Sequence, residues 1–145
     1  MNTIVFLLFL AATVYYVWSG KFFNGKKSLA GTGKSFIGVF IGIVIIGFIL
    51  KALVAIIPGF TRNAAGDLME ALGASLVVVW GMRFLIVAIS NIFSGIMEFH
   101  KKYNAANYSR FSPALGKLAP VMLFLIKCIV SLGSVVIFYG IWLAH

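Results

Sequence analysis

The chain has 145 residues, of which 62% are hydrophobic and 10% charged, and its formal net charge is +9. A mean hydropathy of +1.08 excludes an ordinary soluble domain and indicates a polytopic membrane protein. The single cysteine, Cys128, cannot form an intrachain disulfide, and the three acids and two histidines are scattered along the sequence. Because a metal cluster or nucleophilic triad needs several such groups together, we expect no metal, no cofactor and no catalytic residue.

Four apolar runs follow one another along the chain, each near the ~20 residues that a helix needs to cross ~30 Å of hydrocarbon. Including their polar ends, they predict helices over residues 3–18, 35–57, 68–98 and 113–143. The expected fold class is all-α, with four transmembrane helices in an antiparallel bundle that forms one domain, residues 1–145. Pro58 and Gly59 are expected to end the second helix. Trp18 and Trp142 are expected in the aromatic belts at the membrane interfaces.

Two helix starts are marked by local motifs. Asp67, followed three residues later by Glu70, resembles a capping box and predicts the start of the third helix there. Ser112 and Pro113 form a plausible N-cap and first-turn pair, which predicts the start of the fourth helix.

The orientation in the membrane follows from the basic residues between the spans. The second loop has Arg62 alone beside two acids, whereas the first and third loops are strongly basic, so these two are expected on the cytoplasmic side. Both termini are then outside, in a bacterial inner membrane or an equivalent one. The basic loops are expected to attract anionic lipid headgroups, and nucleic acid is not an expected partner because such loops are the ordinary topology signal. The loop residues are Lys21, Lys26, Lys27, Lys34, Lys101, Lys102, Arg110 and Lys117.

Three cations, Lys51, Arg83 and Lys127, fall inside the apolar runs without an acidic residue beside them. A charge in lipid costs from about 2.5 to more than 10 kcal/mol, so such residues usually face a bundle interior, a partner or water. Arg83 is near the middle of its run, whereas Lys51 is within about two turns of the outer end. Asn91 is two turns beyond Arg83, roughly on the same face, where it could hydrogen-bond across helices.

Small and polar residues at helical spacing predict helix contacts. Gly38 with Gly42, and Ser90 with Ser94, are small-xxx-small pairs that permit close helix approach. On the fourth helix Lys127, Ser131 and Ser134 form one polar stripe, which is either a face buried against another helix or the lining of a pore.

These features give three hypotheses for function. The first is a non-catalytic subunit of a larger membrane assembly of the secretion, conjugation, energy-transducing or virion-membrane type. Its intramembrane cations would meet acidic groups of other subunits or lipid. The second is a homo-oligomeric pore or transporter for an anion or anionic lipid, built on Arg83 and the Lys127 stripe. No soluble substrate is indicated by the sequence.

The third hypothesis is a small four-helix membrane enzyme. The size, the four spans and the outer termini are similar to those of the membrane-associated glutathione transferase and eicosanoid enzyme family. That resemblance would imply a trimer with a cytoplasmic thiol-binding site. The family's second-span motif of arginines followed by an Asn and a Glu is missing, because Arg62, Asn63 and Glu70 lie in the outer loop.

Overall fold

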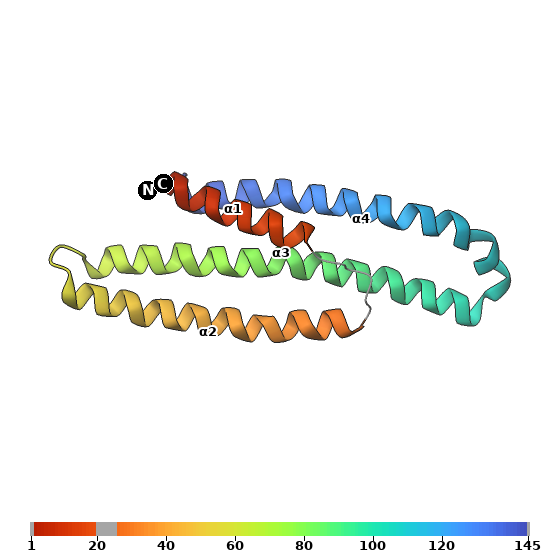
Figure 1. Ribbon diagram of the computed structural model, residues 1–145, viewed down its shortest axis with the longest axis horizontal. Coiled ribbons are helices and arrows are strands. Elements are labelled where there is room, and N and C mark those ends of the chain that lie inside the picture. Colours follow the sequence, from red (N-terminus) through yellow and green to blue (C-terminus); the bar gives the residue numbers. More distant parts are fainter. Residues whose placement is uncertain (1, 20–25, 145) are drawn as a thin grey trace.

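The computed structural model describes residues 2–19 and 26–144, but not the side chains at 26–28, 106, 107, 110, 111 and 115. Within these ranges the chain is all-helical and has no strand (Figure 1). The helices are α1 (Asn2–Trp18), α2 (Lys26–Ile56), α3 (Arg62–Tyr103) and α4 (Ala105–Trp142).

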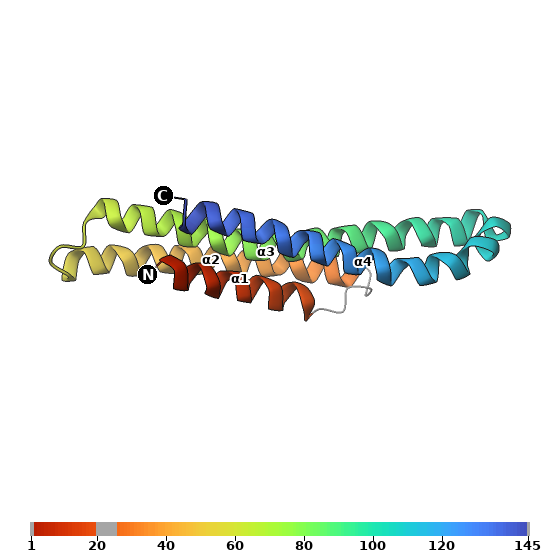
Figure 2. The same cartoon turned by 90° about the horizontal axis from the view of Figure 1, so that it is seen from above.

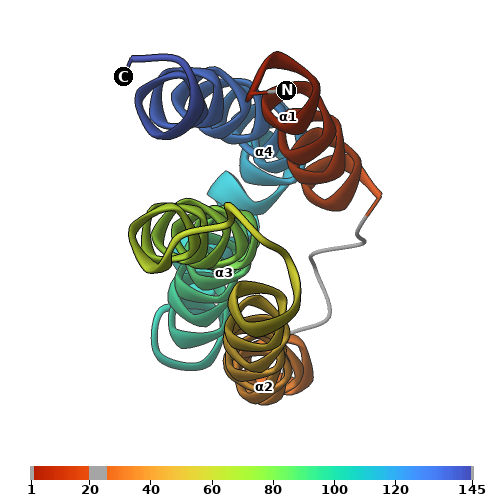
Figure 3. The same ribbon diagram turned by 90° about the vertical axis from the view of Figure 1, so that its left-hand side faces the viewer.

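The helices form an open stack rather than a closed four-helix bundle. Over the described ranges α2 packs only against α3, whereas α1 packs against both α3 and α4, which also pack against each other. Figure 3 shows this arrangement end-on, with α3 between α2 on one side and the α1–α4 pair on the other. The expected bundle is therefore not closed, because α1 and α2 do not meet.

Three of the helices, α2, α3 and α4, are long and apolar enough to cross a membrane. The protein therefore has the composition of a membrane-embedded chain. α1 is equally apolar but has only 17 residues, or about 26 Å of helix.

The helices differ greatly in length, so the α3–α4 hairpin extends beyond the end of α1. The last turn of α1 reaches Arg83, and α3 continues from there to Tyr103, 20 residues further, or about 30 Å. Figures 1 and 2 both show α3 and α4 extending well past the C-terminal end of α1. We call this part of the molecule, residues 88–125, the distal hairpin.

The ends of α2 and α3 are set by local backbone chemistry. Pro58 and Gly59 terminate α2 as predicted, with Gly59 at φ 92°, a conformation that side chains disfavour. The predicted start of α3 is wrong, because the N-cap is Thr61, whose hydroxyl accepts a hydrogen bond from the Ala64 amide at 3.2 Å. Asp67 and Glu70 lie inside the helix instead of opening it.

The predicted start of α4 is also wrong. The helix begins at Ala105, directly after Asn104, so only Asn104 separates it from α3. Pro113 and Pro120 are accommodated inside the helix. Proline at an interior position removes a backbone hydrogen bond, yet Ala119 and Met122, on either side of Pro120, both face α3.

The buried core is small and lies where α1, α3 and α4 meet. Val17, Met82, Ile86 and Val87 form it. Two turns nearer the N-terminus of α1, Phe9 stacks on the rings of Phe138 and Trp142, at centroid distances of 5.9 and 6.0 Å. Most other large apolar side chains that the structure describes are exposed, as expected for surfaces that face lipid or other proteins.

Candidate functional site

The C-terminal turn of α1 contacts two of the three predicted intramembrane cations. The Arg83 guanidinium carbon lies 4.0 Å from the centroid of the Tyr16 ring, and the Lys127 ammonium nitrogen lies 5.5 Å from that of Trp18. Both distances are within the range of cation–π attraction. The end of a helix also carries a partial negative charge, which favours cations at this place. Arg83 therefore has an aromatic partner within its own chain.

The polar stripe on α4 is a helix contact. The Trp18 indole N–H donates to the Ser131 hydroxyl at 3.2 Å, so the stripe faces α1. Ser134 is fully buried and donates to the Ser131 carbonyl at 2.7 Å. The geometry fits the first of the two predicted interpretations, a face buried against another helix.

Asn91 and Ser94 make their hydrogen bonds within α3. Asn91 donates to the Val87 carbonyl at 2.9 Å, and a bond across helices stays a prediction. Ser94 donates to the Ser90 carbonyl, also at 2.9 Å. Ser90 is buried and faces α4, whereas Ser94 is half-buried, so only the first member of this small-residue pair lies deep in a helix contact.

The predicted glycine seam is wrong within the chain. A Cβ atom built on Gly38 or Gly42 would meet nothing within 4 Å. The glycine of α2 that lies close to α3 is Gly47, where a Cβ would come within 3.4 Å of the Met69 methyl carbon. Contact of Gly38 and Gly42 with another protomer stays a prediction.

Instead, Gly38 and Gly42 line an open groove between α1, α2 and α3, with a volume of about 540 Å³. Tyr15 and Tyr16 of α1 form one wall and Trp80 of α3 the other. The groove exists because α1 and α2 both lean on α3 without touching each other. We refer to it below as the α1–α2 groove.

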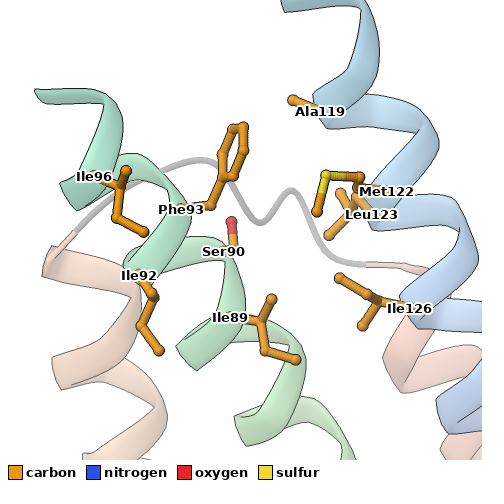
Figure 4. Close-up of a pocket in the computed structure, with 9 residues that line it drawn as sticks. All are labelled: Ile89, Ser90, Ile92, Phe93, Ile96, Ala119, Met122, Leu123 and Ile126. Carbon is orange, nitrogen blue, oxygen red and sulfur yellow. The ribbon is translucent and has the colours of Figure 1, made fainter. Parts of the chain in front are cut away.

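A second, smaller hollow of about 200 Å³ lies between α3 and α4 in the distal hairpin. Figure 4 shows its lining, in which Phe93 and Ile96 from α3 lie opposite Ala119 and Met122 from α4. Ser90 contributes its hydroxyl oxygen to this otherwise apolar wall.

The remaining predicted cations lie on the surface. Lys51 is exposed and lines a shallow pocket with Arg62 near the α2–α3 turn, so it is far from the cations at the end of α1. Of the basic loop residues, Lys34, Lys101, Lys102 and Lys117 are exposed. Lys21 and the side chains of Lys26, Lys27 and Arg110 lie outside the described residues.

Sequence reasoning missed the role of the three tryptophans as ties between helices. Each donates its indole N–H to an oxygen on a different helix, at 2.9 to 3.2 Å. The pairs are Trp18 with the Ser131 hydroxyl, Trp80 with the Thr32 carbonyl, and Trp142 with the Ser75 hydroxyl. Trp142 is buried, and its place in an interfacial belt stays a prediction. A buried indole N–H needs a hydrogen-bond acceptor, and this requirement is the signal in the sequence that could have predicted such pairs.

Across the described residues, no group of three or more His, Cys, Asp or Glu side chains is placed to hold a metal ion. Comparisons with protein-family models, with curated proteins and with solved structures give no match.

Proposed function

We propose that the chain is a small, non-catalytic integral-membrane subunit of a larger membrane assembly. The observation that carries the proposal is the distal hairpin, on which large apolar side chains are exposed along both helices. Ile92 is 62% exposed, Ile96 52% and Val121 53%. A contiguous apolar surface of this kind marks a place where a protein or a membrane is bound.

The membrane placement that best fits the charges puts the outer boundary at Glu70 and the inner boundary near Ser90. These residues are 20 positions apart on α3, or about 30 Å, the thickness of the hydrocarbon core. Glu70 lines a pocket with Gly140 near the end of α4, and Lys127 follows Ile126, which lies opposite Ser90. Glu70 then lies at the outer boundary and Lys127 near the inner boundary.

This placement supports basic loops on the inner side and both termini on the outer side. In this placement the end of the distal hairpin extends about 20 Å beyond the bilayer on the inner side. The exposed lysines Lys101, Lys102 and Lys117 lie near its tip. A partner that covers apolar flanks beneath a basic tip would itself combine apolar and acidic surface, and charge complementarity of this kind directs partner choice.

Purification from the native membrane in mild detergent tests the proposal. We expect foreign subunits in stoichiometric amounts with the wild-type chain, and their loss with Ile92→Asn on the distal hairpin. Ile129→Asn, a matched change of an exposed apolar residue on α4, is the control and should retain them. A chain that purifies alone as a symmetric ring would instead support the pore or transporter hypothesis.

A further inference from the structure

The α1–α2 groove is shaped to hold an apolar chain. Gly38 and Gly42 leave its floor open, and the aromatic rings of Tyr15 and Trp80 line its sides. Its volume of about 540 Å³ falls in the range of pockets that hold small ligands. The groove lies within the segment that we place in the bilayer, so its natural contents are the molecules of the membrane.

Two cations stand at the inner end of the groove. Arg83 continues the groove-lining face of α3, because it follows Leu76 and Trp80 at helical spacing and contacts Tyr16. Lys34 is exposed and lies directly before Ser35 and one turn before Gly38, both of which line the groove. The two cations lie at similar positions along the axes of the two helices.

The position of Lys34 along the helix axis follows from the contacts that its neighbours on α2 make with α3. The Thr32 carbonyl accepts a hydrogen bond from Trp80 at 3.0 Å, and the Phe36 ring lies 4.6 Å from the Trp80 ring. Lys34 is between these two residues in sequence, and Arg83 is one turn beyond Trp80. Both side chains are long enough to extend toward the same headgroup.

The three carboxylates of the chain lie elsewhere. Asp67 and Glu70 line a pocket between α3 and α4 near the outer end. Glu98 is 15 residues beyond Arg83 on α3, or about 22 Å along the helix. The inner end of the groove is therefore a place of positive charge within the described chain.

We propose that the α1–α2 groove binds an anionic phospholipid, with one acyl chain along Gly38 and Gly42 and the phosphate at Arg83 and Lys34. Arginine is suited to phosphate because its planar fork donates two parallel hydrogen bonds. The short α1 helps, because a short apolar helix thins the bilayer around it and brings the headgroups inward. A second copy of the chain is the less favourable occupant, since it would bring the same cations to the groove in a symmetric pair.

The inference rests on the proposed function only for its placement in the membrane, and its test uses the isolated chain. Purified protein in neutral detergent is titrated with dioleoyl phosphatidylglycerol or with dioleoyl phosphatidylcholine, and bound lipid is counted by native mass spectrometry. We expect phosphatidylglycerol to bind more tightly, and Lys34→Gln to weaken it about fivefold, the effect of one basic residue near a lipid surface. Lys117→Gln, an equally exposed lysine outside the groove, should leave binding unchanged.

Filling the groove tests the acyl chain separately from the headgroup. Gly42→Phe should lower the binding of both lipids, whereas Gly95→Phe should not, since Gly95 also has nothing within 4 Å of its Cβ position but lies in the distal hairpin. Helical circular dichroism verifies that each variant is folded.

Equal binding of the two lipids, or equal effects of the paired variants, would overturn the inference. A change in oligomer size with Gly42→Phe alone would also overturn it and assign the groove to a second copy. A chain that purifies without foreign subunits yet selects phosphatidylglycerol would refute the proposed function and leave this inference standing.

Discussion

Replacing Arg83 and Tyr16 singly and together isolates the contact that joins α3 to the end of α1. Arg83→Met removes the charge while keeping most of the side-chain length, and Tyr16→Leu removes the ring. Because the guanidinium carbon lies 4.0 Å from the ring centroid, each single change breaks the same interaction. The double variant then measures how far the two effects overlap.

The expected coupling free energy is about 1 to 2 kcal/mol. Cation–π pairs contribute about 0.5 to 1 kcal/mol at exposed sites and about 2 kcal/mol or more when desolvated. Arg83 and Tyr16 are both half-buried, which places them between these limits. A coupling of this size changes the ratio of folded to unfolded protein by about 5- to 30-fold.

Denaturant-induced unfolding in mixed micelles, followed by tryptophan fluorescence, gives the four free energies of the cycle. Tyr16→Phe retains the ring and should cost less than Tyr16→Leu, and Arg83→Lys should retain only part of the coupling because it lacks the planar guanidinium. The control cycle pairs Arg83 with Tyr139, an exposed tyrosine near the far end of α4. If both cycles give couplings within about 0.3 kcal/mol of zero, the limit of additivity for distant sites, the contact does not stabilise the fold.

The remaining predictions concern the helix seams, the caps and the topology. Gly47→Leu should destabilise the protein by about 1 to 3 kcal/mol through overpacking against α3, whereas Gly42→Leu should change the unfolding free energy by less than about 0.5 kcal/mol; a larger loss at Gly42 would contradict the observed seam. Thr61→Ala should cost about 1 kcal/mol by removing the N-cap of α3, and an unchanged denaturation midpoint would count against that cap. Cysteines placed at Asn63 and Asn104 in a cysteine-free chain should be labelled from opposite sides of sealed membranes, and labelling from one side would disprove the topology.

The all-helical fold was readable from the sequence because its signals are local. Long apolar runs predict helices without reference to any other part of the chain, and Pro58 with Gly59 can only interrupt one. The starts of α3 and α4 were misplaced because several residues near each start have capping side chains. At α3 both Thr61 and Asp67 fit a cap, and the chain uses the earlier one.

The candidate site was less predictable, because it depends on how helices distant in sequence are aligned. The sequence identified Arg83 and Lys127 as charges in need of partners, but it does not contain the register that sets Tyr16 and Trp18 beside them. The same register decides that Gly47 rather than Gly42 meets α3, although both glycines are on apolar helix turns. The sequence pattern therefore identifies the unusual residues but not their partners.

Because α2 is attached through α3 alone, the protein has two parts that differ in how cooperatively they unfold. One part is the packed set of α1, α3 and α4, and the other is α2. α1, α3 and α4 share a core, so the opening of one exposes the others, whereas α2 is held along a single seam and by the turn at Gly59. The amide hydrogens of α2 are therefore expected to exchange with solvent earlier than those of α3 at the same depth, as in other local openings. Its departure from α3 would leave the other three helices packed, which makes α2 the element that can rearrange without unfolding the molecule.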